Sequence, residues 1–285
     1  MGGLPFTPLV IIGAGRSGTN VLRDVLTGLP GFASWKCDEI NPIWRHGNIN
    51  WPDDELPVEA ARPEVKHFIR QQFLKVWRQN GQPEFVVEKT CANALRVGFV
   101  AAVLPEARFV HIIRHGADVA ASAEKRWRGE LEMPGLPYFW AKIRYAPKGD
   151  LPRYGLSFVK NRLALRGRMR RFSSWGPRFK GMDELAGTDL PRLTAMQWAA
   201  SVVRADAAFA NMAKDRVIEL RYEDFIAAPE AELSRILAFL GQVPDPAQIA
   251  RASLIVRRGA RPPSPVPAGL APVIAPVLKA HGYGE

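Results

Sequence analysis

A glycine-rich loop with one arginine and three other polar residues lies near the start of the chain. The apolar run Leu9–Ile12 predicts a buried strand, and the loop after it, Gly13–Asn20, reads Gly-Ala-Gly-Arg-Ser-Gly-Thr-Asn. Apolar residues at helical spacing then predict a helix over Thr19–Leu29. A turn of this kind between strand and helix directs backbone N–H groups and the positive end of the helix dipole at one point. The loop is therefore predicted to bind an anion.

The glycine spacing fits the dinucleotide fingerprint G-x-G-x-x-G through Gly13, Gly15 and Gly18. That motif needs a second strand that ends in an acidic residue about twenty positions further on. Asp38 and Glu39 stand near that distance, but the residues before them form a poor strand. The dinucleotide interpretation therefore lacks one of its two elements.

A Walker A phosphate loop needs a lysine and a hydroxyl-bearing residue where this chain has Thr19 and Asn20. The usual residues for magnesium and a γ-phosphate are thus missing. In a third interpretation, Arg16 supplies the positive charge, and Ser17 and Thr19 supply hydroxyl groups. Such a loop suits a terminal phosphate or sulfate and needs no metal.

A second motif follows another predicted strand. Phe109–Ile113 is apolar except for one histidine, and it runs into Arg114, with Ser122 eight positions later on the next predicted helix. The planar guanidinium group of an arginine can hold a phosphate through two hydrogen bonds, and a nearby hydroxyl can add a third. This pair is therefore a second candidate phosphate site.

Together the two motifs resemble those of the sulfotransferases that use 3′-phosphoadenosine 5′-phosphosulfate (PAPS). Arg16-Ser17-Gly18-Thr19 is similar to the family's 5′-phosphosulfate loop, and Arg114 with Ser122 is similar to its 3′-phosphate motif. Glu88-Lys89-Thr90 and Arg221-Tyr222-Glu223-Asp224-Phe225 match in the family's order, and the resemblance covers most of residues 9–241.

The resemblance implies an enzyme that moves the sulfuryl group from PAPS to a hydroxyl or amine acceptor, releases PAP and uses no metal. It implies that Arg16 and Lys89 stabilise the leaving nucleotide. It also implies a set of donor-binding residues: Gly15, Arg16, Ser17, Gly18, Thr19 and Asn20 in the loop, Arg114 and Ser122 at the 3′-phosphate, Tyr222 near the nucleotide, and Arg257, Arg258 and Gly259 in a late phosphate motif.

The acceptor must lose a proton, and Glu39 is the first candidate for the base. Several sulfotransferases that act on carbohydrate or protein hydroxyls keep a glutamate in this region, and partial burial can make a carboxylate basic enough. Asp38 and His46 remain open as alternatives. Three further histidines are weaker candidates, of which the one inside a predicted strand is expected in the core: His67, His111 and His115.

Two other functions stay open at this point. A P-loop nucleotide phosphotransferase would use the same strand, loop and helix, although the Walker lysine is missing. A non-catalytic protein that binds a nucleotide or another anion would keep the loop without the chemistry. The acceptor is not identified by the sequence, and carbohydrates, lipids and other small molecules all remain candidates.

Predicted strands and helices alternate along the chain, which indicates an α/β fold. The alternation predicts one domain over residues 1–285, with a central parallel sheet, helices on both faces and the ligand at the carboxyl ends of the strands. The predicted strands are 9–12, 85–88, 109–113 and 217–220, and the predicted helices are 19–29, 63–79, 94–104, 117–127, 191–213, 230–240 and 271–280. A proline-rich tail that begins at residue 261 is expected to end regular packing.

The positive charge is concentrated in one stretch. Residues 140–180 hold twelve basic residues and one acidic residue, so this stretch accounts for the formal net charge of +11 of the whole chain. It is predicted to be an insertion that shapes the choice of acceptor, which would then be anionic or associated with a membrane. No module for sequence-specific binding of nucleic acid surrounds it.

The remaining composition favours a cytoplasmic enzyme of 285 residues, with attachment to a membrane surface left open. Cys37 and Cys91 offer neither a disulfide framework nor the spacing of metal ligands. No apolar run approaches the eighteen or so residues of a membrane span, and the first residues lack the pattern of a secretory signal. The oligomeric state is not predicted.

Overall fold

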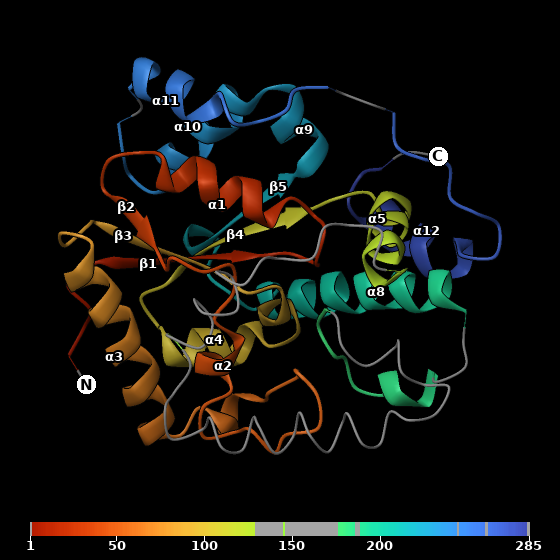
Figure 1. Ribbon diagram of the computed structural model, residues 1–285, viewed down its shortest axis with the longest axis horizontal. Coiled ribbons are helices and arrows are strands. Elements are labelled where there is room, and N and C mark those ends of the chain that lie inside the picture. The colour runs from red at the N-terminus through yellow and green to blue at the C-terminus, as the bar shows by residue number, and fades with distance from the viewer. Residues whose placement is uncertain are drawn as a thin grey trace.

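A parallel sheet of five strands forms the centre of the protein (Figure 1). The computed structural model describes residues 2–128, 145, 176–185, 189–243, 245–259 and 262–283. The strand order is β2-β3-β1-β4-β5, and every neighbouring pair is parallel. The strands are β1 (Thr7–Ile12), β2 (Phe32–Ser34), β3 (Phe85–Lys89), β4 (Arg108–Ile113) and β5 (Val217–Arg221).

Helices cover both faces of this sheet (Figure 1). Helices α1, α9, α10 and α11 lie on one side, and α3, α4 and α8 lie on the other. The helices are α1 (Thr19–Thr27), α2 (Asn41–Trp44), α3 (Pro63–Gln79), α4 (Val97–Val103), α5 (Gly116–Arg128), α8 (Leu190–Phe209), α9 (Tyr222–Ala227), α10 (Pro229–Phe239), α11 (Pro246–Ser253) and α12 (Ala271–Ala280).

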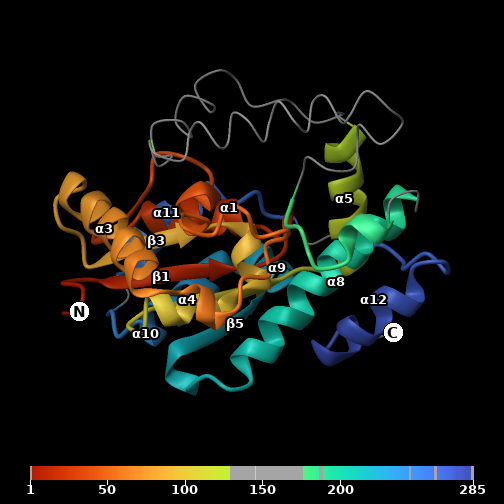
Figure 2. The same ribbon diagram turned by 90° about the horizontal axis from the view of Figure 1, so that it is seen from below.

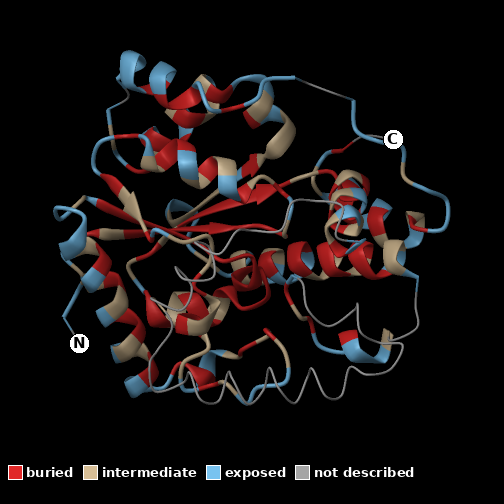
Figure 3. Cartoon of the chain, viewed as in Figure 1, coloured by how far each residue is buried: buried red, intermediate tan, exposed pale blue. Residues whose placement is uncertain are grey.

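Alternation along the central strand explains the two layers. Leu9 and Ile11 of β1 pack into the core beneath α1 and α10, while Val10 and Ile12 pack into the core beneath α3 and α4. Successive side chains of a strand point to opposite faces, so a strand that is apolar at every position is buried on both sides. The buried residues form a continuous layer on each side of the sheet (Figure 3).

The predicted α/β class is confirmed, and the helices predicted over 63–79 and 271–280 have the predicted bounds. The judgement that the residues before Asp38 form a poor strand was wrong, because Phe32–Ser34 pairs with β3 as the edge strand β2. Only Phe32 of these three residues is buried, so the segment has no alternation of apolar and polar residues that would predict a strand. Helices α9 and α11 were also not predicted.

Packing does not end at the proline-rich tail. Helix α12 follows the prolines and lies against α8 in both views (Figures 1 and 2), with Ile274 and Val277 in one core cluster with Trp198. The expectation of an unpacked tail was therefore wrong, because the helix after it has an apolar face that α8 buries.

Most of the predicted basic insertion at 140–180 lies outside the described residues. At its described end, the backbone N–H of Arg178 donates to Asp54 Oδ2 at 2.9 Å, and Phe179 is buried. Among the described helices, none has both the length and the apolar character needed to cross a membrane.

Candidate active site

The loop between β1 and α1 is a tight turn with an unusual backbone conformation. Gly18 and Arg16 both have positive φ angles, +89° and +75°. A left-handed conformation is unusual for a residue with a side chain, and such outliers concentrate at functional sites. Gly13 has no room for a side chain either, because an added Cβ would stand 2.7 Å from the Ile112 carbonyl oxygen of β4. Gly13, the first glycine of the fingerprint, thus allows a close approach of the loop to β4.

The two predicted phosphate motifs touch each other. Arg16 Nε donates to Ser122 Oγ at 3.0 Å, and Arg114 Nη1 donates to the Arg16 carbonyl oxygen at 3.1 Å. Arg114 follows the carboxyl end of β4, and Ser122 lies on α5. Because β1 and β4 are neighbours, their carboxyl ends bring the loop and the arginine to one edge of the sheet.

Three arginines gather at this edge. Burial lowers the pKa of Arg16, and the positive charges of Arg126 and Arg114 lower it further. A cluster of like charges is unfavourable unless an anion binds there, so the electrostatics favour a ligand with at least one phosphate or sulfate group.

Two polar atoms of the same region lack partners among the described residues. Ser17 Oγ and Arg114 Nε are both buried, and neither has a hydrogen-bond partner there. A buried polar group without a partner costs free energy, and a bound anion would satisfy both. The residues present therefore fit a ligand that carries phosphate groups.

A lysine between two acids stands beside the loop. Lys89 Nζ donates to Asp38 Oδ1 at 2.8 Å and to Glu39 Oε1 at 3.3 Å, and the Lys89 side chain is 1% exposed. Burial acts to lower the pKa of Lys89, but the nearby negative charges, Glu39 first, outweigh it and raise the pKa. Lys89 is therefore a protonated ammonium. Cys91 links Glu39 to the loop after β1. Its backbone N–H donates to Glu39, and its Sγ lies 3.7 Å from Thr19 Oγ1 at the start of α1.

The two acids differ in how they are held. Asp38 Oδ1 accepts hydrogen bonds from Lys89 and from Arg23 Nη1, the latter at 3.2 Å. Glu39 Oε1 accepts from Lys89 and from the backbone N–H of Cys91 at 3.3 Å. Their side chains are exposed to a similar extent, 28% for Asp38 and 26% for Glu39, so both can be reached from solvent.

The four candidate histidines differ in their surroundings. The His46 ring stacks on Phe68, with ring centres 3.7 Å apart, and His67 is exposed on α3. His111 is buried within β4, as the sequence predicted for a core residue. His115 is also buried, and burial lowers its pKa.

Tyr222 lies at the loop after β1, whereas Arg258 of the predicted late phosphate motif contacts α10. The Tyr222 ring lies beside Gly18 and under the guanidinium group of Arg114. Gly15 is half-buried in the loop and Asn20 is exposed on the first turn of α1. Arg258 forms an ion pair with Glu230 at the start of α10, while Arg257 and Gly259 are exposed.

A buried polar network holds the backbone of Ile40, the residue after Glu39. The sequence analysis did not identify this network. Thr90 Oγ1 accepts from the backbone N–H of Ile40 at 3.1 Å and donates to Glu88 Oε1 at 2.6 Å. Asn93 Nδ2 donates to the other oxygen of Glu88 at 2.8 Å. A charged residue at a fully buried strand position was the available signal, because such a residue needs partners.

A second missed contact fixes the turn after β4. Glu223 accepts from the backbone N–H of His115 at 3.1 Å and from Tyr283 OH at 2.6 Å. The turn that carries Arg114 is thereby tied to the last described residue of the chain.

Comparisons with known proteins identify the family of this chain. A family model described as the sulfotransferase family matches residues 8–135 and 168–245. A search of curated proteins finds no match. Among solved structures, a sulfotransferase domain from the curacin biosynthetic pathway is 16% identical, with a TM-score of 0.55 and 99% of each chain covered.

Two further solved structures share the fold. The sulfotransferase domain of the olefin synthase of Synechococcus PCC 7002 is 15% identical, with a TM-score of 0.57, and the match covers 100% of this chain and 97% of the other. Sulfotransferase STF9 from Mycobacterium avium is 13% identical, with a TM-score of 0.56, and the match covers 99% and 78%. At these identities the structures support the fold, and the family model supplies the membership. This chain is a sulfotransferase, and it belongs to the sulfotransferase family.

Proposed function

We propose that this sulfotransferase takes the sulfuryl group from PAPS, transfers it to a hydroxyl or amine acceptor and releases PAP, without a metal ion. The observation that carries the proposal is the contact between the two phosphate motifs, in which Arg16 reaches Ser122 and Arg114 reaches the Arg16 carbonyl. A donor with phosphate groups at both its 3′ and 5′ positions needs two such motifs at one edge of the sheet. A nucleotide with phosphates at its 5′ end alone would leave one of them unused.

In this proposal the loop holds the 5′ end of the donor. Backbone N–H groups, the hydroxyls of Ser17 and Thr19 and the positive end of α1 face the phosphosulfate. Arg114 and Ser122 hold the 3′-phosphate. Arg16 and Lys89 stabilise the negative charge that develops on the bridging oxygen as the bond to sulfur breaks, a role in which a comparable donor contributes about 2.7–4 kcal/mol.

Glu39 is the proposed base. It accepts one hydrogen bond from an ammonium and one from a backbone N–H, whereas Asp38 is held by two cations, Lys89 and Arg23. Pairing with cations lowers the basicity of a carboxylate, so Asp38 is the poorer base of the two. His46 is a weaker alternative, because its ring stacks on Phe68 on the α3 side.

We further propose that residues 1–285 act as one domain in the cytoplasm, with residues 140–180 as an insertion that selects the acceptor. The excess of basic residues in that stretch favours an anionic or membrane-associated acceptor, such as a carbohydrate or a lipid. The aromatic residues of the same stretch suit the faces of sugars or apolar groups.

Thermal unfolding with different ligands tests the donor. PAP in the presence of EDTA should stabilise the protein by about 2.7 kcal/mol at a hundred times its dissociation constant, while NAD should have no effect. Stabilisation by ATP with magnesium but not by PAP would contradict the proposal. A screen of carbohydrates, lipids, phenols and amines with labelled PAPS would then identify the acceptor class.

A further inference from the structure

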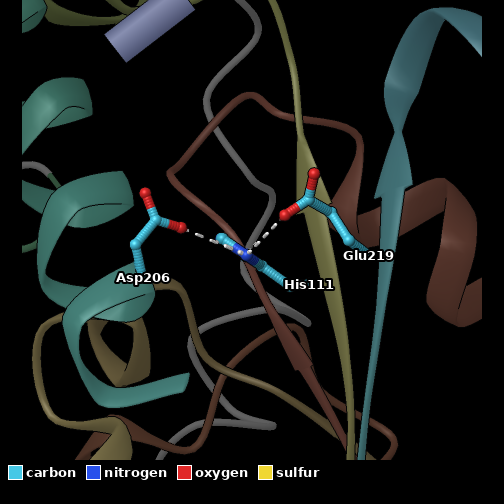
Figure 4. A group of neighbouring side chains, drawn as sticks. All are labelled: His111, Asp206 and Glu219. Atoms are coloured by element: carbon cyan, nitrogen blue, oxygen red, sulfur yellow. Dashed lines mark ion pairs between the residues drawn. The ribbon is translucent and has the colours of Figure 1, made fainter. Parts of the chain in front are cut away.

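A histidine and two carboxylates from three different elements converge on the α8 side of the sheet (Figure 4). His111 stands on β4, Glu219 is its paired residue on β5, and Asp206 lies on α8. One ligand atom of each residue lies within 4.8 Å of the others. Figure 4 shows both carboxylates turned toward the imidazole ring.

The distances in this group do not suit hydrogen bonds. His111 Nδ1 lies 3.7 Å from Asp206 Oδ1 and 3.9 Å from Glu219 Oε2. Both separations exceed the length of an N–H···O hydrogen bond, about 2.7–3.2 Å. Donor atoms bound to one ion at about 2.0–2.2 Å stand roughly 3.3–3.6 Å apart in a tetrahedron. The two separations that involve His111 therefore need to close by only a few tenths of an ångström, and the ligand atoms of all three residues lie within 4.8 Å of one another.

The burial of His111 is the strongest indication that this group binds an ion. His111 is 2% exposed and its other ring nitrogen, Nε2, has no hydrogen-bond partner among the described residues. A buried imidazole is normally held by a hydrogen bond, and this one directs Nδ1 between two carboxylate oxygens instead. The side chains of Asp206 and Glu219 are 35% and 48% exposed, so an ion can enter from solvent.

We propose that His111, Asp206 and Glu219 bind a divalent first-row transition-metal ion, for which Zn²⁺ is the probe. One imidazole nitrogen and two carboxylate oxygens form a ligand set that such ions accept. Three protein ligands leave one coordination position for water. The ion joins β4, β5 and α8, so its role is to stabilise the fold.

His281 supplies the outer contacts that such a site needs. Its Nε2 lies 2.9 Å from Asp206 Oδ2, and its Nδ1 lies 3.3 Å from Glu219 Oε1. These are the oxygens that do not face His111, so His281 orients both carboxylates while their other oxygens converge. Ligands of a metal are commonly fixed by hydrogen bonds of this kind.

Binding of Zn²⁺ and Co²⁺ to the full chain tests the site. The untagged protein is first treated with EDTA and dialysed. Calorimetry should then detect one ion per chain, Zn²⁺ should raise the melting temperature, and bound Co²⁺ should give visible absorption bands that Zn²⁺ abolishes. Asp206→Asn and Glu219→Gln keep the side-chain shape and are partly exposed, so each should fold and lose at least tenfold in Zn²⁺ affinity.

Glu64→Gln is the matched control, because Glu64 is exposed at the start of α3, where it pairs with Arg62 and not with a member of this group. This variant should bind Zn²⁺ like the unaltered protein. His281→Gln should weaken binding roughly 10- to 100-fold while one ion per chain still binds. Absence of one-to-one binding would overturn the proposal. So would Zn²⁺ affinities of Asp206→Asn and Glu219→Gln that equal the affinity of Glu64→Gln.

Discussion

The guanidinium carbon of Arg114 lies 4.5 Å from the centre of the Tyr222 ring. The same ring meets Gly18 so closely that a Cβ added there would stand 2.3 Å from Tyr222 Cδ2. The Tyr222 ring therefore contacts both the glycine of the first phosphate motif and the arginine of the second. A residue after β5 thus packs against a site that β1 and β4 carry.

The aromatic ring of Tyr222, more than its hydroxyl, should govern donor binding. Tyr222→Phe keeps the ring under Arg114 and is expected to bind PAP within about twofold of the unaltered protein. Tyr222→Ala removes a contact of about 0.5–2 kcal/mol and should weaken PAP binding roughly 2- to 30-fold. Calorimetric titration with PAP measures both. Equal losses in the two variants would show that the hydroxyl is what matters.

Arg114 should distinguish two nucleotides that differ at the 3′ position. Arg114→Ala is expected to weaken binding of PAP by roughly 10- to 100-fold, because a charge-assisted hydrogen bond to phosphate is lost. Binding of adenosine 5′-phosphosulfate, which has no 3′-phosphate, should fall much less. Arg114→Lys keeps the charge without the planar group, so its affinity for PAP should lie between those of Arg114→Ala and the unaltered protein. An equal loss for both nucleotides would contradict the assignment of Arg114 to the 3′-phosphate.

Glu39 should be needed for turnover but not for donor binding. Glu39→Gln can still accept from Lys89 and Cys91 but cannot take a proton, so kcat should fall by roughly 10²- to 10⁴-fold while PAP affinity stays close to that of the unaltered protein. Asp38→Asn and His46→Ala are the comparison variants and should retain more activity. Full activity in Glu39→Gln with loss in either comparison variant would move the base to that residue.

Salt should act on the acceptor more than on the donor. The excess of basic residues at 140–180 attracts an anionic acceptor over a range that salt screens beyond about 8 Å at physiological ionic strength. Raising the salt concentration should therefore raise the acceptor's KM more than that of PAPS. Combined substitution of Arg166, Arg168, Arg170 and Arg171 by glutamine should have the same effect. An acceptor KM that neither treatment changes would leave this stretch without a part in acceptor binding.

Much of the site follows from local sequence patterns. The loop after β1 and Arg114 after β4 were predicted because each follows a buried strand, and parallel strands bring their carboxyl ends to one edge. The prediction that His111 is a core residue was also confirmed. It followed from the apolar neighbours of His111 along the strand.

The contacts that hold the site could not be predicted in this way. Tyr283 and Glu223 are 60 positions apart, and no local period links a tyrosine near the chain end to a turn after β4. The carboxylates beside His111 come from β5 and α8, so only the folded sheet brings them together. The edge strand β2 has three residues, which is too few for an alternating pattern.

The buried acid under Glu39 should make stability depend on pH. Glu88 is fully buried on β3, and burial raises its pKa to about 7, although the hydrogen bond from Thr90 and the charge of Arg96 oppose the rise. The folded protein therefore holds this proton to a higher pH than the unfolded chain does, whose glutamate titrates near 4.5. The contribution of Glu88 to stability is full below about 4.5 and is lost as the pH rises through about 7.

Denaturant unfolding of the unaltered protein and of Glu88→Gln at several pH values tests this dependence. Glutamine does not titrate, so the difference in unfolding free energy between the two proteins isolates Glu88 from the other acids. This difference should shift against the unaltered protein by on the order of 3 kcal/mol between pH 4.5 and pH 8. Glutamine also presents an amide toward Asn93 Nδ2, which imposes a cost that does not vary with pH. The slope is therefore the decisive quantity, and a difference that stays constant over this range would mean that Glu88 is charged in the folded protein throughout.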